Sequence, residues 1–205
     1  MKFFITGIGT DVGKTIAAAV ITEALEADYW KPIQAGDIDN CDSKKIKSYI
    51  SNSKTVIHPN SYMLSTPASP HYAAQMDNIT IDATQIKKPA TNNHLVIEGA
   101  GGLLVPLNDT LTIADLIKPD YKIIVVSRHY LGSINHTLLT FEALRQRNIT
   151  VAGIVFNGDQ NRATEAIILK QTGSKMIGRI DNEPYFDKNV IKEYADLFSE
   201  KLLTL

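Results

Sequence analysis

Residues Gly7 to Thr15 read Gly-Ile-Gly-Thr-Asp-Val-Gly-Lys-Thr, and this stretch decides which fold the chain encodes. It follows a β-rich apolar run, Phe3 to Thr6, and precedes an alanine-rich segment, Ile16 to Leu25, with apolar residues at helical spacing. A glycine-rich turn between a strand and a helix is the context that a phosphate-binding P-loop requires. Its backbone N–H groups and the positive end of the helix dipole attract phosphate oxygens. We therefore predict a nucleotide site here.

The two residues that end this loop have expected roles. Lys14 is expected to reach the β- and γ-phosphates, and the Thr15 hydroxyl to ligate magnesium. One feature departs from the ordinary motif, because five residues rather than four separate Gly7 from Gly13. A chance glycine turn is the alternative, and the position between a strand and a helix argues against it.

Short apolar runs alternate with amphipathic stretches along the rest of the chain. This alternation predicts βαβ units, hence a doubly wound α/β fold with a mostly parallel sheet and helices on both faces. Ligands then bind at the carboxyl ends of the strands. The expected strands are 28–32, 95–97, 122–127, 151–156 and 175–180, and the expected helices are 134–147, 163–171 and 188–203. Residues 52–89 are read as a loop-dominated insertion with short helices, one near 72–76, that is either functional or a plain surface excursion.

The composition narrows the function classes. A chain of 205 residues with 44% hydrophobic residues fits one domain over residues 1–205. The net charge of -1 gives no electrostatic case for a nucleic acid or an anionic membrane, and no apolar run approaches a bilayer span. The one cysteine, Cys41, rules out an intrachain disulfide. We expect a cytoplasmic protein.

Three charged residues follow the first strands and are candidates for the site. Glu98 comes directly after the strand 95–97, where it is either a magnesium ligand or a charged strand end. Asp42 is either a second ligand or the cap of a helix that starts near Lys44. Lys31 ends the second strand, and from the residues alone a solvated lysine is the preferred reading. Lys44, Lys45 and Lys47 are read as a solvated helix face.

Two further positions lie at the ends of later elements. Gly132 to His136 opens a helix whose N-terminus is able to bind a carboxylate. Asn157, after the strand 151–156, either reads a nucleotide base through its amide or is a turn residue before Gly158.

Taken together these blocks resemble the dethiobiotin synthetase family over nearly the whole chain, apart from the C-terminal portion. The blocks that carry the resemblance are 6–15, 31–36, 98–102 with Pro106-Leu107, and 131–136; Ser69-Pro70-His71 and Asn157 agree in order and spacing. The long spacing of the P-loop is the family's own form. The resemblance implies a doubly wound homodimer with its site at the interface. It also implies an enzyme that joins 7,8-diaminononanoate and CO2 to dethiobiotin with ATP and Mg2+.

The resemblance also implies a role for each matching position. The catalytic group is Lys31, Lys14, Thr10 and Asp11; the nucleotide is held by Asp11, Val12, Gly13, Lys14, Thr15, Ile16, Asp42, Glu98, Gly99, Ala100, Gly101 and Asn157. Mg2+ is held by Thr15, Asp42 and Glu98, and the substrate by Lys31, Ala35, Ser133, Ile134 and Asn135, the last three from the other subunit.

Some positions depart from the family pattern. Asp11 and Ala35 stand where better-known members have Glu and Ser, and Asp181 stands where a proline is expected. The segment around Asp181 also looks short for binding a base. We therefore expect that other nucleoside triphosphates are accepted beside ATP.

Two rival readings remain at the level of sequence. A cobyrinic-acid amidase needs a glutaminase domain with a nucleophilic cysteine, and the chain has neither the length nor a suitably placed cysteine. A partition-type ATPase switch usually carries a second lysine early in the P-loop, where this chain has Gly7 to Gly9.

Overall fold

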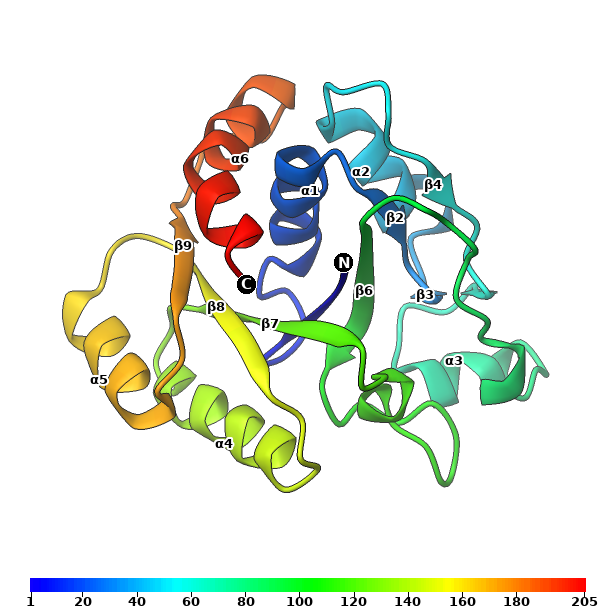
Figure 1. Cartoon of the computed structure of the whole chain (residues 1–205). Helices are drawn as coiled ribbons and strands as arrows, with labels where there is room; N and C mark the ends of the chain where they lie inside the picture. Colours follow the sequence, from blue (N-terminus) through cyan, green and yellow to red (C-terminus); the bar gives the residue numbers. More distant parts are fainter.

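The computed structural model describes residues 1–205, and a parallel sheet of seven strands forms its centre (Figure 1). The strand order is β4-β2-β6-β1-β7-β8-β9, and every pair of neighbours is parallel. The strands are β1 (Lys2–Gly7), β2 (Asp28–Trp30), β4 (Ile57–His58), β6 (Leu95–Gly102), β7 (Tyr121–Arg128), β8 (Val151–Asn157) and β9 (Met176–Ile180). The predicted fold class is thereby confirmed.

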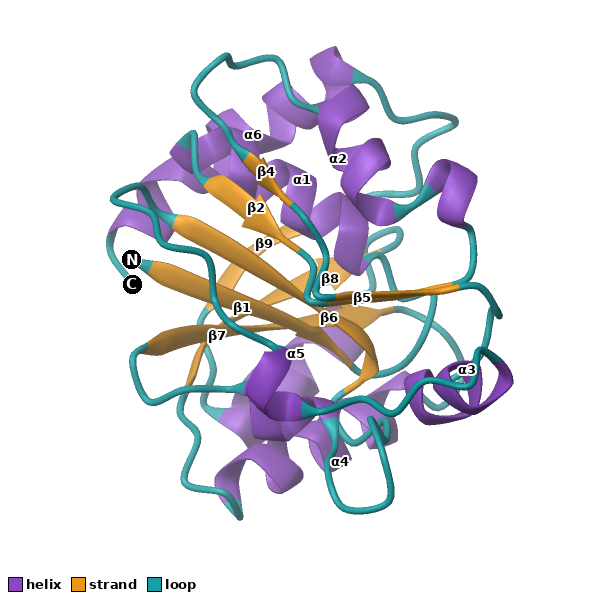
Figure 2. Cartoon of the chain, turned by 90° about the vertical axis from the view of Figure 1, so that its right-hand side faces the viewer, coloured by secondary structure: helices purple, strands orange, loops and turns teal.

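Helices cover both faces of this sheet, as Figure 2 shows. One face carries α1 (Lys14–Leu25), α2 (Asp42–Tyr49) and α6 (Lys188–Leu203), and the other carries α4 (Ser133–Arg145) and α5 (Arg162–Thr172). The short helix α3 (Pro70–Met76) and the 3-10 turns Ile38–Asn40, Ala83–Gln85 and Ile113–Leu116 complete the helical elements. No helix of the chain has both the length and the apolar character needed to cross a membrane.

The strands read as unbroken apolar runs because side chains on both of their faces are covered. Phe3, Phe4 and Ile5 of β1, the central strand, are fully buried, as are Ile124, Val125 and Val126 of β7. Small residues let α1 lie close to the sheet, since Ala17, Ala18 and Ala19 are all fully buried. This packing fixes the start of α1 at the carboxyl end of β1.

Several boundaries differ from the sequence-based expectations. Helix α1 begins at Lys14, two residues before the predicted start at Ile16, because Gly13 already forms its N-cap. Strand β2 ends at Trp30, so Lys31 lies beyond it. The predicted strand 28–32 is followed by a further strand, β3 (Ile33–Ala35). Strand β3 pairs with β5 (Tyr62–Leu64) in a separate two-stranded sheet.

The insertion at residues 52–89 contains more structure than its polar sequence indicates. The helix expected near 72–76 is present as α3, but the strands β4 and β5 were not foreseen. Both are too short for a period-2 pattern to be visible, since β4 has 2 residues and β5 has 3. Strand β4 adds an edge strand to the main sheet, and β5 places residues 67–70 over the carboxyl ends of the strands.

Asp28, at the start of β2, joins three segments and gives a first prediction. Its carboxylate accepts hydrogen bonds from Thr91 Oγ1 (2.6 Å), Asn93 Nδ2 (3.2 Å) and the Val56 N–H (3.1 Å), and it contacts His58 Nε2 at 3.1 Å. Burial alone would raise the pKa of this carboxyl, but these hydrogen bonds outweigh burial and lower it. A lowered folded-state pKa adds stability above the unfolded value of about 4, and this stability is lost as pH falls through the folded value.

We expect Asp28→Asn to lower the free energy of unfolding by about 1–3 kcal/mol at pH 7, because a charged acceptor is replaced by a neutral one. The midpoint of thermal unfolding should fall by roughly 5 °C, and the difference from the wild type should shrink at acidic pH. Thermal unfolding at pH 7 and pH 4 measures both effects, with the exposed Asp109→Asn as the control. A difference that stays constant with pH would contradict the ionic part of this account.

Candidate functional site

The P-loop presents a row of unused backbone donors. None of the N–H groups from Gly9 to Ile16 donates to another protein atom, and the first that does is that of Ala17, to the Gly13 carbonyl at 3.0 Å. Gly13 makes this arrangement possible with a φ of 92°, and a Cβ placed there would lie 2.3 Å from Asn157 Nδ2. The first N–H groups of a helix have no partner within the helix, and in this chain they extend the row of unused donors from the loop into the start of α1. This loop is therefore built to bind an anion.

Lys14 lies at the centre of this loop. Its side chain is 7% exposed, and its Nζ donates to the Gly9 carbonyl at 2.8 Å. Burial lowers the pKa of Lys14 to about 8, with Lys31 acting in the same direction and Glu98 opposing it. A bound phosphate would restore the preference for the charged form, since an opposite charge favours the ammonium.

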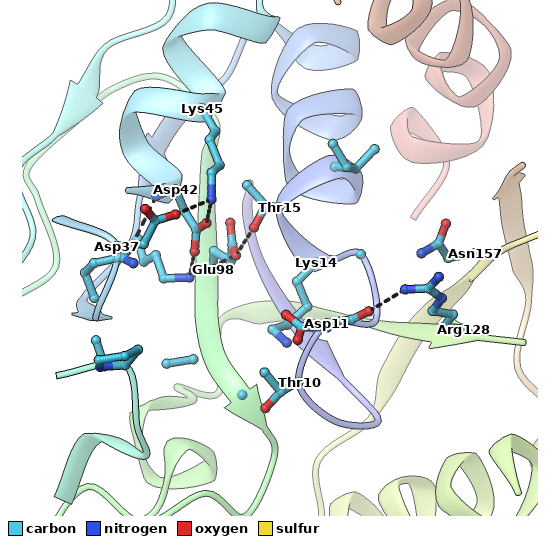
Figure 3. A pocket seen from close by; sticks show the side chains of 18 of the residues that line it. Thr10, Asp11, Lys14, Thr15, Asp37, Asp42, Lys45, Glu98, Arg128 and Asn157 are labelled. Atoms are coloured by element: carbon cyan, nitrogen blue, oxygen red, sulfur yellow. Dashed lines mark hydrogen bonds and ion pairs between the residues drawn. The ribbon is translucent and has the colours of Figure 1, made fainter. Parts of the chain in front are cut away.

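A second lysine, Lys31, is held beside the loop between two carboxylates, Asp42 and Glu98, which Figure 3 labels. Lys31 Nζ contacts Glu98 Oε1 at 3.0 Å and pairs with Asp42 Oδ2. Burial by itself would lower the pKa of Lys31, but the two carboxylates outweigh it and raise the pKa. Lys31 is therefore a fixed cation at neutral pH, and the preference for a solvated lysine was wrong because the side chain is only 6% exposed.

Glu98 contacts Lys31, Thr15 and Tyr29, and we call these residues together with Asp42 the cluster. Its Oε1 accepts from Thr15 Oγ1 at 2.9 Å, and its Oε2 accepts from the Tyr29 hydroxyl at 2.7 Å. Strand β6 continues to Gly102, so Glu98 lies within the strand and not after it, paired with Ile5 of β1. The reading as a plain charged strand end is thereby wrong, since Glu98 is 1% exposed.

Asp42 completes the cluster from α2. It is the first residue of that helix, but Cys41 is the N-cap and no side chain caps the helix, so the capping alternative is wrong. The Asp42 carboxylate points instead toward Lys31 and, at 3.8 Å, toward Lys45. Burial by itself would raise the pKa of Asp42, but the pairing with Lys31, together with Lys45 and Thr15, outweighs burial and lowers the pKa. Asp42 is thus an anion at neutral pH.

One cavity of about 1010 Å³ joins these groups at the carboxyl ends of the strands. It gathers most of the predicted site residues: Thr10, Asp11, Gly13, Lys14, Thr15, Ile16, Lys31, Ala35, Asp42, Glu98, Ala100, Gly101 and Asn157. Two predicted nucleotide contacts, Val12 and Gly99, are buried behind it and do not line it.

Three predicted substrate contacts lie elsewhere in the chain. Ser133, Ile134 and Asn135 form the start of α4 and do not line the cavity. Ser133 is buried, whereas Ile134 and Asn135 are exposed. Within one chain, these three residues lie apart from the other predicted site residues. The sequence-based expectation was that they act on the site of a second subunit, and that expectation requires such a separation.

Sequence reasoning missed several residues that line the cavity. Lys45 was read as part of a solvated face, yet its Nζ donates to Asp37 Oδ2 at 2.8 Å on the cavity wall. Gln34 accepts from the Asp42 N–H at 3.3 Å and donates to the Gly36 carbonyl at 2.9 Å. Arg128 ends β7. The rule that selected Glu98, a charged residue after a buried strand, would have found Arg128 as well.

The chain is similar to known proteins along most of its length. A family model described as an AAA domain matches residues 1–190. An ATP-dependent dethiobiotin synthetase of Christiangramia forsetii is 56% identical over 98% of this chain and 97% of its own length. That of Cytophaga hutchinsonii is 51% identical over 95% of both chains, and that of Agrobacterium fabrum 45% identical over 90% of this chain and 87% of its own.

The chain belongs to the dethiobiotin synthetase family. Solved structures with much lower sequence identity confirm the P-loop fold of this member of the dethiobiotin synthetase family. A putative plasmid partition protein from Borrelia burgdorferi superposes with a TM-score of 0.58 at 14% identity, covering 99% of this chain and 98% of its own. A chain of the MinC:MinD cell division protein complex from Aquifex aeolicus gives a TM-score of 0.56 at 14% identity, covering 100% of this chain and 96% of its own. At this identity the likeness concerns the fold alone, so it does not favour the partition-type rival.

Proposed function

We propose that this chain carries out the ATP- and Mg2+-dependent carboxylation and ring closure of 7,8-diaminononanoate with CO2 to give dethiobiotin. Its family membership makes it an ATP-dependent ligase of biotin synthesis. The observation that supports the finer proposal is the convergence of Lys14, Lys31, Thr15, Asp42 and Glu98 on one cavity beside the P-loop. Residues 1–205 are treated as one functional domain, because a single core cluster extends from β1 to α6.

The proposed reaction builds up negative charge next to two cations. One substrate amine takes up CO2 and loses a proton to become a carbamate. A carbamate oxygen attacks the γ-phosphorus, ADP leaves, and a carbamic-phosphoric anhydride forms. The second amine attacks the anhydride carbon, and phosphate leaves with the closure of the ring. Lys14 and Lys31 stabilise the phosphate and carbamate oxygens throughout, while Thr10 and Asp11 line the loop face where these atoms meet.

The oxygen atoms at the cluster fit a magnesium ion. Asp42 and Glu98 already contact one ammonium from two sides, and Thr15 Oγ1 lies 2.9 Å from Glu98 Oε1. Mg2+ binds through one or two carboxylates plus phosphate and water oxygens, and Asp42 and Glu98 supply two carboxylates beside the P-loop. Magnesium bound there would neutralise phosphate charge; Thr15, Asp42 and Glu98 would hold it.

We place the substrate beside Lys31 in this proposal, because Gln34, Ala35 and residues 67–70 line the cavity there. We further propose a homodimer in which Ser133 to Asn135 of a second copy bind the substrate carboxylate at the start of α4. The observation behind this is their position outside the cavity of their own chain. A solution mass equal to one 22.6 kDa chain at working concentration would contradict it.

Incubation with 7,8-diaminononanoate, labelled bicarbonate, Mg2+ and ATP tests the reaction. We expect dethiobiotin that carries the label, detected by mass spectrometry, and none without nucleotide. Absence of product from a folded chain that binds nucleotide would reject the proposed reaction.

The same assay with GTP and CTP tests nucleotide selectivity. Asp181, Asn182, Glu183 and Phe186 line the outer end of the cavity, where we place the base. Asn157 uses one N–H of its amide on the Val12 carbonyl at 2.9 Å, so it keeps one donor and its carbonyl oxygen, and these are able to pair with more than one kind of base. We therefore expect turnover with GTP and CTP within about ten-fold of that with ATP, a discrimination of roughly 1.4 kcal/mol. A much stronger preference for ATP would contradict this expectation.

A further inference from the structure

Arg128 stands at the carboxyl end of β7, directly beside Asn157 at the end of β8 in the sheet register. Both side chains reach the P-loop from the same side (Figure 3). Arg128 Nη1 donates to the Asp11 carbonyl at 3.0 Å, and Asn157 Nδ2 donates to the Val12 carbonyl at 2.9 Å. Two neighbouring strand ends thus hold two consecutive carbonyls of the loop.

Holding a carbonyl also orients the N–H of the next residue. The peptide unit is planar, and because this chain has no cis peptide bonds, its C=O and N–H point in opposite directions. Arg128 holds the Asp11 oxygen outward, so the Val12 N–H points to the opposite side of the loop. The Val12 N–H is among the donors that have no protein acceptor.

The conformation of Asp11 requires such support. Its φ is 55°, in the left-handed region that residues other than glycine seldom adopt. Its peptide oxygen has Arg128 as its hydrogen-bond partner. Without that hydrogen bond, the unliganded loop loses an interaction that stabilises the peptide orientation in which the Val12 N–H is exposed.

The positive charge of Arg128 also favours an anionic ligand in this cavity. The side chain lines the cavity with Lys14, and no carboxylate lies within ion-pair distance of its guanidinium. Only one hydrogen bond of this five-donor group is formed in the chain. An unpaired guanidinium at the rim of an anion site adds positive potential where a polyphosphate would lie.

We propose that Arg128 is a positioning residue for the nucleotide: it fixes the Asp11–Val12 peptide so that the P-loop donors face the phosphates before the ligand arrives. The proposal rests on the nucleotide site of the proposed function. It does not depend on the second substrate, because ADP binding alone reports it. A failure of the dethiobiotin assay would therefore leave its test intact.

The test compares Arg128→Ala and Arg128→Lys with the matched control Arg162→Ala, an exposed arginine at the start of α5 that contacts only Gln160. We expect Arg128→Ala to weaken the binding of MgADP and MgATP by a similar factor, roughly ten-fold or more, in calorimetric titrations. Arg128→Lys should recover most of the affinity, because an ammonium can still donate to the Asp11 carbonyl. The KM for ATP should rise more than kcat falls.

Thermal unfolding separates positioning from a general structural role. Without nucleotide, Arg128→Ala should unfold within a few degrees of the wild type, while the rise in midpoint caused by saturating ADP should shrink. If the alanine variant does not fold, Arg128→Met, which has no hydrogen-bond donor, takes its place with the same expectation. Unchanged ADP affinity would overturn the proposal, and so would a loss that appears with ATP but not with GTP, since that pattern indicates reading of the base.

Discussion

Replacing Lys31 with alanine is expected to reduce dethiobiotin formation by at least about a hundred-fold while nucleotide binding stays measurable. Lys31 Nζ lies 3.0 Å from Glu98, and the pKa of Lys31 is raised because two carboxylates outweigh the effect of burial. A fixed cation of this kind does not act as a base at neutral pH. Its proposed work is to stabilise the oxygens of the carbamate and of the transferred phosphoryl group.

The Lys31→Ala variant also leaves Asp42 and Glu98 without their shared cation. Breaking such a buried pair costs about 3–5 kcal/mol of folding stability, so unfolding must be measured beside turnover. Lys31→Arg keeps the charge and should fold, yet it should also turn over slowly because a planar guanidinium does not reproduce the position of an ammonium. Lys44→Ala, which replaces an exposed lysine of α2, is the control. Near-normal turnover in folded Lys31→Ala would refute the assigned role.

Replacing Lys14 with alanine should weaken ADP and ATP binding by roughly a hundred-fold, because charge-assisted hydrogen bonds to phosphate are lost from the centre of the loop. Turnover should fall with it. This contrast with Lys31→Ala, which should spare binding, separates the two lysines. Calorimetric titration of ADP into both variants measures it, and equal losses of affinity in both would contradict the separate roles.

The pH dependence of ADP binding gives Lys14 a signature of its own. Burial lowers the pKa of Lys14 to about 8, and only the ammonium form attracts phosphate. Below pH 8 the free protein is already charged there; above it, binding must take up a proton. Affinity should therefore decline as pH rises through about 8, by up to about ten-fold per pH unit. The Lys14→Ala variant should lose this decline, and its persistence would assign it to another group.

The sheet and the P-loop could be predicted from local patterns. The unbroken apolar runs of β1, β7 and β8 are typical of strands covered on both faces, and the glycines of the loop mark the strand-to-helix turn. The strands β4 and β5 could not be predicted, because their 2 and 3 residues pair only when distant segments supply the partner strand.

The candidate site divides along the same line. Lys14 and Thr15 belong to a contiguous motif and were expected from the residues alone. Asp42 and Lys31 carry no local signal, since an aspartate near a helix start and a lysine before a proline both have ordinary alternatives. Arg128 has only the signal of a charged residue after a buried strand, and that signal does not show which group it contacts. Their roles depend on which side chains they contact at the carboxyl edge of the sheet, and the order of the strands in the sheet determines those contacts.

The sequence by itself determined the α/β fold, the phosphate loop and, through its resemblance to known synthetases, the family. Each of these depends on residues that are neighbours in the chain or on long blocks of matching order. Only the tertiary structure decided that Lys31 is a buried cation between Asp42 and Glu98, and that Arg128 holds the P-loop. These contacts join residues 11 to 117 positions apart, and they form because parallel strands bring their carboxyl ends to one edge of the sheet.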